Sequence, residues 1–149
     1  MTEIPVLWTE WPHGSDRYRE AVTLRQTVLR TPLKMTFTEE ELAAEGAPQR
    51  HVGGIAGGKI VASACFLPVD DGGVKIRQVA VAEAWRGHGL GRDLMFFAER
   101  LAREAGAGWV TLHARLVVKD FYLRLGYAPA GGEFVEIGLP HVEMRKRLA

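Results

Sequence analysis

The segment from Gln78 to Arg92 concentrates residue types that could bind a phosphate-bearing ligand. An apolar run, Val79-Ala80-Val81, precedes a glycine-rich turn, and an amphipathic pattern typical of a helix follows it. The turn consists of Arg86, Gly87, His88, Gly89, Leu90, Gly91 and Arg92. Glycines let the backbone close around phosphate oxygens, and a helix N-terminus offers unpaired N–H groups to an anion. The segment therefore predicts a main-chain cradle for a pyrophosphate.

Two other phosphate-binding motifs do not fit this turn. A P-loop ends in Gly-Lys-Ser/Thr, and the turn contains no such sequence. A dinucleotide-binding fingerprint needs a third glycine where Arg92 stands. It also needs an acidic residue at the end of the next strand, where His113-Ala114-Arg115 stands. The expected ligand is therefore neither a P-loop nucleotide nor a dinucleotide.

The turn must be positioned by the elements around it, and the chain predicts alternating strands and helices. Strands are predicted over residues 6–11, 50–56, 59–67, 74–81 and 109–114, with weaker candidates at Tyr127 and over residues 142–145. Helices are predicted from Asp16 as N-cap to Pro32, from Thr38, which opens a capping box, to residue 44, and over residues 90–105 and 117–125. This alternation indicates one domain, residues 1–149, with a mixed α/β sheet.

Composition and charge limit the classes of function. The 149 residues are 47% apolar and 25% charged, with a formal net charge of +1. These values fit a soluble domain and offer no electrostatic case for nucleic-acid or membrane binding. A single cysteine, Cys65, cannot form an internal disulfide, which fits a cytoplasmic location. The histidines at positions 13, 51, 88, 113 and 141 lack metal-ligand spacing, so we expect no metal site.

A second motif, Phe121-Tyr122 followed by Gly126-Tyr127, lies at the end of the predicted helix 117–125. Together with Arg86-x-x-Gly89-x-Gly91 after an apolar strand, it resembles the acetyl-CoA signature of the GCN5-related N-acetyltransferases (GNAT). Residues 136–144, Glu-Ile-Gly-Leu-Pro-His-Val-Glu-Met, are similar to the C-terminal motif of the ElaA-like bacterial acetyltransferases. The resemblance covers residues 74–147 and implies a GNAT-like fold, a mixed, mostly antiparallel central sheet flanked by helices.

The resemblance also implies acetyl-CoA as the co-substrate and assigns its contacts by position. In the family, the amides of the turn hold the CoA pyrophosphate, and the preceding strand pairs with the pantetheine arm and polarises the thioester carbonyl. Arg115 stands where many relatives carry an asparagine that contacts pantetheine. The implied cofactor-binding residues are Val79, Ala80, Val81, Arg86, Gly87, His88, Gly89, Leu90, Gly91, Arg92, Arg115 and Phe121.

The expected reaction is direct transfer of the acetyl group, within a ternary complex, to a primary amine of a small molecule or peptide. The resemblance implies that Tyr122 is the general acid, and a phenol with a pKa of about 10 suits a thiolate leaving group. Glu136 and His141 are the predicted bases, with His113 as a further candidate. Cys65 lies among small residues in a predicted strand, so we expect it to be buried and not to act as a nucleophile.

Several alternatives stay open at this level. The chain could be a CoA-binding sensor or interaction domain without catalysis, and turnover with amines would separate the two. Glu39-Glu40-Glu41 could be a solvated helix start or could line the acceptor entrance. Arg25 could lie on a solvated helix face with Arg17 and Arg19, or it could attract a carboxylate of the acceptor. A homodimer is one expected assembly, and the sequence does not identify the acceptor.

Overall fold

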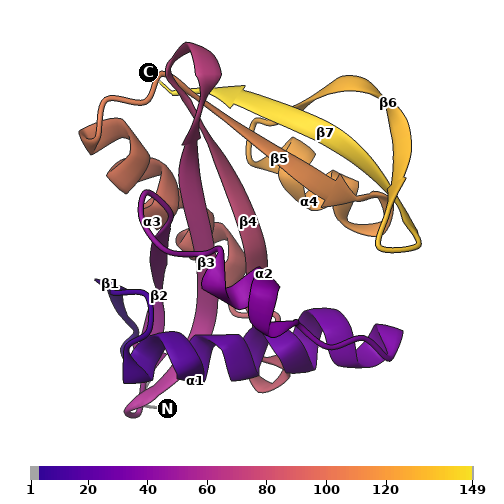
Figure 1. The fold of residues 1–149 in the computed structure, drawn as a ribbon. Helices are drawn as coiled ribbons and strands as arrows, with labels where there is room; N and C mark the ends of the chain where they lie inside the picture. The colour runs from indigo at the N-terminus through magenta and orange to yellow at the C-terminus, as the bar shows by residue number, and fades with distance from the viewer. Residues whose placement is uncertain (1–3, 149) are drawn as a thin grey trace.

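The computed structural model describes residues 4–148, whose strands form one sheet with helices on both faces (Figure 1). The strands are β1 (Leu7–Trp11), β2 (Arg50–Ala56), β3 (Lys59–Val69), β4 (Gly73–Val81), β5 (Trp109–Arg115), β6 (Ala128–Glu136) and β7 (Leu139–Arg147). They lie in the order β1-β2-β3-β4-β5-β7-β6. Neighbouring strands are antiparallel except β4 and β5, which run parallel. The predicted mixed, mostly antiparallel sheet is confirmed.

Helices cover both faces of the sheet. They are α1 (Asp16–Arg25), α2 (Glu39–Ala43), α3 (Leu90–Glu104) and α4 (Lys119–Arg124). In Figure 1, α1 and α2 cross in front of the sheet and α3 lies behind it. Alternate side chains of β3 contact the two layers: Ala64 and Phe66 join the core under α3, whereas Cys65 faces Gln49 on the other side. Burial on both faces accounts for the nearly continuous apolar run of β3.

The N-cap of the first helix differs from the prediction, and the N-cap of the second agrees with it. The N-cap of α1 is Ser15, whose hydroxyl accepts a hydrogen bond from the Tyr18 N–H, so the prediction of Asp16 was wrong by one residue. Asp16 instead lies in the first turn, where its carboxylate suits the helix dipole. The capping box at Thr38 is confirmed, because Thr38 and Glu41 each accept a hydrogen bond from the other's N–H.

The end of the first helix also differs from its predicted form. The α-helix ends at Arg25 and continues as a π-helical turn, Gln26–Arg30, and then as a 3-10 turn, Thr31–Leu33. Pro32 does not end the helical segment but lies at the start of the 3-10 turn, where a missing N–H breaks no hydrogen bond. The extra turns carry the helical segment further along the sheet, toward the ends of β4 and β5 (Figure 1).

The C-terminal hairpin is longer than the sequence predicts. β6 and β7 each contain 9 residues and join at Ile137-Gly138, where both residues have positive φ. β6 shows no strand pattern in the sequence because nearly all of its side chains are exposed. Tyr127, a predicted strand residue, precedes β6 and is 2% exposed in the core. The predicted helix 117–125 is shorter, because residues 116–118 form a 3-10 turn.

β4 and β5 pair at one end and then separate. Residues 73–75 of β4 align with residues 109–111 of β5, and beyond them the strands diverge (Figure 1). β4 leads into the glycine-rich turn and α3, whereas β5 leads into α4. Main-chain groups along the inner edges of the separated strands therefore have no partner from the other strand.

Candidate active site

A cavity of about 860 Å³ lies where β4 and β5 diverge, a size typical of small-molecule sites. One part of its lining, which we call the turn side, consists of Val79, Val81, Trp85, Arg86, Gly87, Gly89, Leu90, Gly91, Arg92, Val118, Phe121 and Tyr122. The other part, which we call the charged side, consists of Val28, Leu29, Arg30, Glu41, Lys75, Arg77, His113, Arg115, Glu136, Ile137 and His141. The cavity therefore joins a glycine-rich surface, apolar apart from Arg86 and Arg92, to a surface dominated by charged side chains.

Most of the predicted cofactor-binding residues line this cavity, but three need comment. Ala80 is 2% exposed and does not belong to the lining, and His88 is exposed in the turn outside it. Arg115 lies on the charged side, and its Nη2 donates a hydrogen bond to the Leu29 carbonyl at 2.9 Å. The structure thus groups Arg115 with the helical segment rather than with the glycine-rich turn.

The turn side is built mainly from main chain. Gly89, at φ +77°, is the N-cap of α3 and has no side chain to bond the first N–H groups of the helix. Gly87 is also left-handed, at φ +83°, and a Cβ there would meet nothing within 4 Å. At Gly91 a Cβ would lie 3.1 Å from Phe121 Cζ, so the glycine permits α3 to approach α4 closely. The N-terminal amides of α3 therefore remain available to an anion.

A β-bulge in β4 supplies a further main-chain group. Cys65 of β3 pairs with Arg77, but Ser63 pairs with Ala80, so one β4 residue is additional. Gln78, at φ +56°, adopts the left-handed conformation that this bulge requires. A bulge leaves part of the ladder unpaired, and both Gln78 and Val79 line the cavity. Such an N–H is suited to polarise a carbonyl oxygen placed beside it.

Tyr122 lies on α4 and is the tyrosine of the cavity lining. Its side chain is 7% exposed, and its ring packs edge-on against Phe121 and Tyr127, with centroids 5.0 and 5.8 Å away. Burial raises the pKa of Tyr122 to about 12. The phenol therefore stays protonated at neutral pH and can donate a proton.

Four titratable side chains from four strands meet on the charged side. His113 Nδ1 of β5 lies 2.9 Å from Glu136 Oε1 of β6 and 3.5 Å from Lys75 Nζ of β4. His141 Nε2 of β7 lies 3.7 Å from Glu136 Oε2. His141 Nδ1 lies 2.8 Å from the Leu139 carbonyl, and its side chain is 3% exposed. The structure therefore brings together the predicted bases Glu136, His141 and His113.

The charges of this cluster favour an ionised carboxylate. Burial raises the pKa of Glu136, but the hydrogen bond with His113 and the charges of His113, His141 and Lys75 outweigh burial and hold it below 4.5. Burial lowers the pKa of the Lys75 ammonium, and the neighbouring Arg77 lowers it further. An ionised carboxylate only accepts hydrogen bonds, so the contact with Glu136 suits an imidazole that donates from Nδ1. The pair thus fixes the orientation of the His113 ring in the cavity.

The prediction for Arg25 was wrong, whereas the prediction for Cys65 is confirmed. Arg25 does not face the cavity: it is 3% exposed, pairs with Glu45 and stacks on Phe37, so both alternatives for Arg25 were wrong. Arg17 and Arg19 do form surface pairs within α1. The expected burial of Cys65 is confirmed at 1% exposure, and burial raises its thiol pKa to about 12. A thiol with that pKa is not a ready nucleophile.

Sequence reasoning missed several residues of the charged side. Lys75 and Arg77 alternate with Val74 and Ile76 in β4, and this polar alternation in a central strand was a signal that could have been used. Arg30 was missed because the π-helical turn that carries it has no sequence signature. Glu41 lines the cavity, which favours the second of the two readings of the acidic run.

Residues 4–148 contain neither a metal-ligand cluster nor a helix that could span a membrane. No group of three or more His, Cys, Asp or Glu side chains in this range is placed to hold a metal ion. Within the same range, no helix has the length and apolar character needed to cross a membrane.

Solved structures with the same fold define the class of protein. The acyl-CoA N-acyltransferase of Pseudomonas aeruginosa superposes with a TM-score of 0.83 at 26% identity, over 95% of this chain and 99% of that one. Escherichia coli ElaA superposes at 0.80 with 26% identity and the same coverage. An aminoglycoside 6'-N-acetyltransferase complexed with coenzyme A shares the fold at 0.78 and 15% identity, over 95% and 96% of the two chains. The fold is that of the acyl-CoA N-acyltransferases.

Sequence comparison then identifies the family. The family described as "Acetyltransferase (GNAT) domain" matches residues 22–148. Escherichia coli ElaA is 31% identical over 105 residues, which are 66% of this chain and 67% of ElaA. The chain spans about half the length of the first curated relatives, two Bacillus subtilis proteins covered to 50% and 51%. The chain belongs to the GNAT family of acyl-CoA-dependent acetyltransferases, and the predicted resemblance to its ElaA-like members is confirmed.

Proposed function

We propose that this protein transfers the acetyl group of acetyl-CoA to a primary amine of a small molecule or peptide, by direct attack within a ternary complex. The observation that carries the proposal is the position of the bulge at Gln78-Val79, between the glycine-rich turn and the charged cluster in one cavity. A thioester whose pyrophosphate lay at the turn would bring its carbonyl to this main-chain group. The reacting atoms would then have donors on one side and proton acceptors on the other.

The turn side suits the donor. Amides at the start of α3, with Arg86 and Arg92 beside them, would bind the CoA pyrophosphate. The open edge of β4 at Val79 and Val81 would pair with the amide groups of the pantetheine arm. Likeness in fold to an acetyltransferase complexed with coenzyme A supports this assignment. Phe121 stays a predicted cofactor contact, whereas Arg115 lies on the charged side, away from the turn.

The chemistry follows from the two sides of the cavity. The amine nitrogen attacks the thioester carbon, the C–N bond forms, and the oxyanion is held by the bulge N–H. The amine proton passes to the cluster of His113, Glu136 and His141, directly or through water. As the C–S bond breaks, the Tyr122 phenol donates its proton to the CoA thiolate. We assign Tyr122 as the acid, and Glu136 and His141 as parts of the base with His113.

Calorimetry and a thiol-release assay test this function separately. We expect CoA and acetyl-CoA to bind, and we expect free CoA thiol to appear when acetyl-CoA is mixed with members of an amine panel. No binding at millimolar CoA would refute the donor site. Tight CoA binding with no turnover on any amine would instead support the sensor or interaction domain that the sequence left open.

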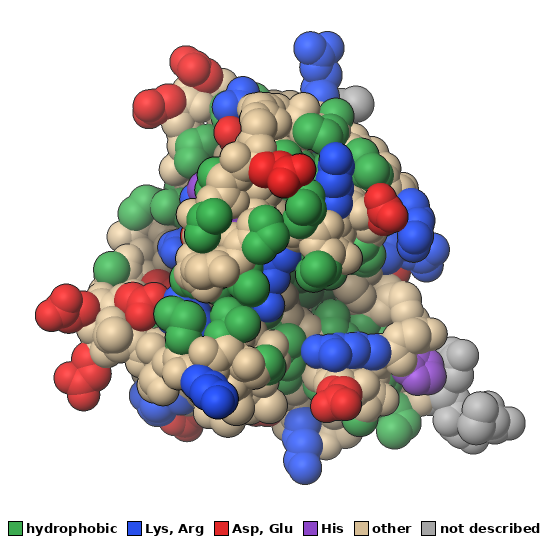
Figure 2. Space-filling model, turned by 90° about the vertical axis from the view of Figure 1, so that its right-hand side faces the viewer, with side chains coloured by type: hydrophobic (Ala, Val, Ile, Leu, Met, Phe, Trp, Pro, Cys, Tyr) green, Lys and Arg blue, Asp and Glu red, His purple; other side chains and the backbone are tan. Residues whose placement is uncertain are grey.

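We also propose a cellular location and an assembly for the protein. We propose a cytoplasmic protein, because the free, buried Cys65 needs no oxidising compartment. Acidic and basic side chains are interspersed on the face in Figure 2 rather than gathered by sign, which supports the prediction of no nucleic-acid partner. A homodimer stays a prediction, and light scattering at several protein concentrations measures it.

A further inference from the structure

The charged side carries more positive than negative charge. Its cations are Arg30, Lys75, Arg77 and Arg115, and its carboxylates are Glu41 and Glu136. Glu41 lies 2.9 Å from Arg30, and Glu136 is bonded to His113 near Lys75. Among residues 4–148, neither Arg77 nor Arg115 has a carboxylate within ion-pair distance. Two guanidinium groups therefore line the cavity without a counter-charge.

The environment of Arg115 makes this excess positive charge unfavourable. Its Nη2 donates to the Leu29 carbonyl, and its side chain is only partly exposed. Burial and the nearby Arg30 both lower the pKa of Arg115. Arg77 has a single long contact, 3.4 Å from Nη1 to Gln49 Oε1. An anion that entered the cavity would relieve the repulsion and would satisfy guanidinium donors that the protein leaves unpaired.

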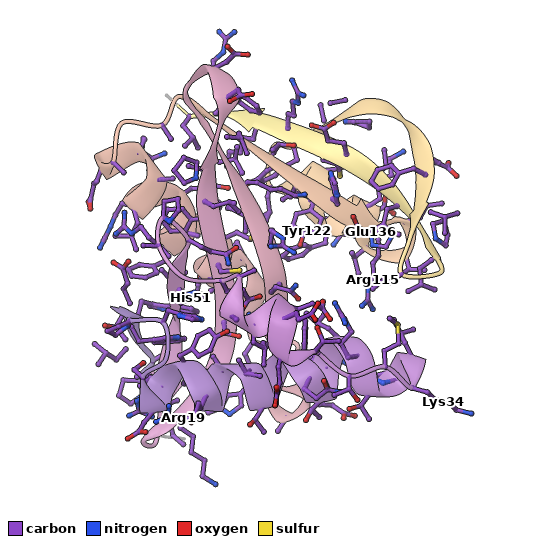
Figure 3. The ribbon with its side chains drawn as sticks, viewed as in Figure 1. Arg19, Lys34, His51, Arg115, Tyr122 and Glu136 are labelled. Carbon is purple, nitrogen blue, oxygen red and sulfur yellow. The ribbon has the colours of Figure 1, made fainter. Side chains whose placement is uncertain are left out.

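The carboxylate of Glu136, on β6, is hydrogen-bonded to β5, the strand that carries Arg115. His113, bonded to Glu136, and Arg115 are two residues apart in β5, and their side chains point to the same face. Residues two apart in a strand are separated by roughly 6.5 Å. Figure 3 shows Arg115 and Glu136 together between the C-terminal hairpin and the first helical segment. An ammonium group beside Glu136 and a carboxylate beside Arg115 would match this pattern.

We infer that the acceptor is an amino acid, a small molecule whose amine approaches His113 and Glu136 while its carboxylate is bound by Arg115 with help from Arg77. This inference rests on the proposed acetyl transfer and specifies its acceptor. The sequence suggested that Arg25 could attract a carboxylate of the acceptor. Because Arg25 is buried against Glu45, we give this role to Arg115 and Arg77 instead. It also removes Arg115 from the cofactor contacts.

The experiment uses a series of ω-amino acids: glycine, β-alanine, γ-aminobutyrate and the next longer homologue. Each is compared with its own carboxamide, which has nearly the same size and lacks only the charge. Calorimetry on the protein saturated with CoA measures both affinities. We expect at least one acid to bind about tenfold or more tightly than its amide, the contribution of a charge-assisted hydrogen bond. The chain length that binds best reports the distance between the two subsites.

Variants test whether Arg115 and Arg77 cause the preference for the acid over its carboxamide. Arg115→Gln should reduce the acid-to-amide ratio to near one, and Arg115→Lys should retain part of it. Arg145→Gln is the matched control, because Arg145 lies on the same sheet face, pairs with Glu143 and does not line the cavity. Arg77→Gln is the second variant if Arg115→Gln does not fold, and it should lower the ratio partially.

The outcomes separate this inference from the proposed function. Equal binding of acids and amides to the wild-type protein overturns the inference, and so does no binding of any member at millimolar concentration. A preference for acids that Arg115→Gln leaves intact also overturns it, as does loss of CoA affinity in that variant. Calorimetry with CoA alone tests the donor site, so its failure is recognised independently of the acceptor result.

Discussion

The turn side and the charged side of the cavity are built by different means. The turn side takes its binding groups from the main chain: the bulge at Gln78, the glycines of the turn, and the first amides of α3. The charged side takes its groups from side chains on β4 to β7 and on the first helical segment. Main-chain donors are positioned by the fold itself, whereas side-chain charges can change without altering the fold. The first arrangement suits a constant donor and the second a particular acceptor.

Tyr122, on the turn side, is the proposed general acid, so its removal should produce the largest effect. If the phenol is the proton donor to the thiolate, as we propose, Tyr122→Phe should lower kcat about 10²- to 10⁴-fold while the affinity for CoA is unchanged. Steady-state kinetics and calorimetry measure these two quantities. Tyr127→Phe is the matched control: Tyr127 is also buried, but its hydroxyl bonds to Glu99 Oε2 at 2.6 Å and does not line the cavity.

The pH dependence of Tyr122 sharpens the same prediction. Because burial raises its pKa to about 12, the phenol stays protonated across the working range. The kcat of the wild-type protein should therefore show no loss of activity from tyrosine ionisation below about pH 10. A fall in kcat near pH 8 that disappears in Tyr122→Phe would contradict the raised pKa.

Substitution on the charged side should affect the acceptor alone. Glu136→Gln removes the carboxylate that orients His113, and we expect kcat/KM for the amine to fall about 10²-fold with CoA affinity intact. Since the neighbouring positive groups hold the pKa of Glu136 below its ordinary value, the wild-type carboxylate stays ionised at neutral pH. Its contribution should be lost only as the pH falls through that lowered value. Glu143→Gln is the control, because Glu143 bonds to Thr111 and Arg145 outside the cavity.

Substitution on the turn side should affect the donor alone, and less strongly. A side chain at Gly87 meets no protein atom within 4 Å, but it must adopt φ +83° and would intrude on the cradle. We expect Gly87→Ala to weaken CoA binding by about tenfold. Gly58→Ala is a close control, with φ +79° and an equally open Cβ position in the β2–β3 turn. Both variants should lose about 1 kcal/mol of unfolding free energy to left-handed strain, and only Gly87→Ala should lose CoA affinity.

The smallest expected effect concerns the Arg30–Glu41 pair at the rim of the charged side. The hydrogen bond from Arg30 lowers the pKa of Glu41 below 4.5, against a smaller opposing effect of burial. Its stabilisation is therefore complete above the ordinary pKa and is lost as the pH falls through the lowered folded value. Because the Glu41 side chain is 40% exposed, we expect less than about 1 kcal/mol.

Urea unfolding of wild type and Glu41→Gln between pH 3 and 7 measures this contribution. The two proteins should differ most at neutral pH and converge toward the acid end. Convergence in the opposite direction, with a larger difference at low pH, would show that the pair has no stabilising role.

The sequence predicted much more of the turn side than of the charged side. Gly87, Gly89 and Gly91 lie within a few residues of one another, so spacing alone indicated a cradle. Short sequence patterns also predicted the hairpin at Gly57-Gly58, the capping box at Thr38 and the burial of Cys65. The predicted role of Tyr122 stays untested, although its placement in the cavity is what that role requires.

The failures have physical causes that are not local. β6 lacked an apolar alternation because its side chains are exposed, and the π-helical turn at Gln26–Arg30 has no propensity signal. Arg25 has the same residue type as Arg115, yet packing buries it against Glu45. Which arginine has a partner depends on contacts between residues far apart in the chain, here 20 positions.

By itself, the sequence determined the turn side of the cavity: a strand, a glycine-rich turn and a helix that follow one another in the chain and offer main-chain groups. The tertiary structure alone decided the charged side. It separated β4 from β5 after three residue pairs and brought Lys75, His113, Glu136 and His141 from four strands to one place. Contiguous motifs need only local backbone preferences, whereas a cluster of distant charges exists only after the sheet has assembled.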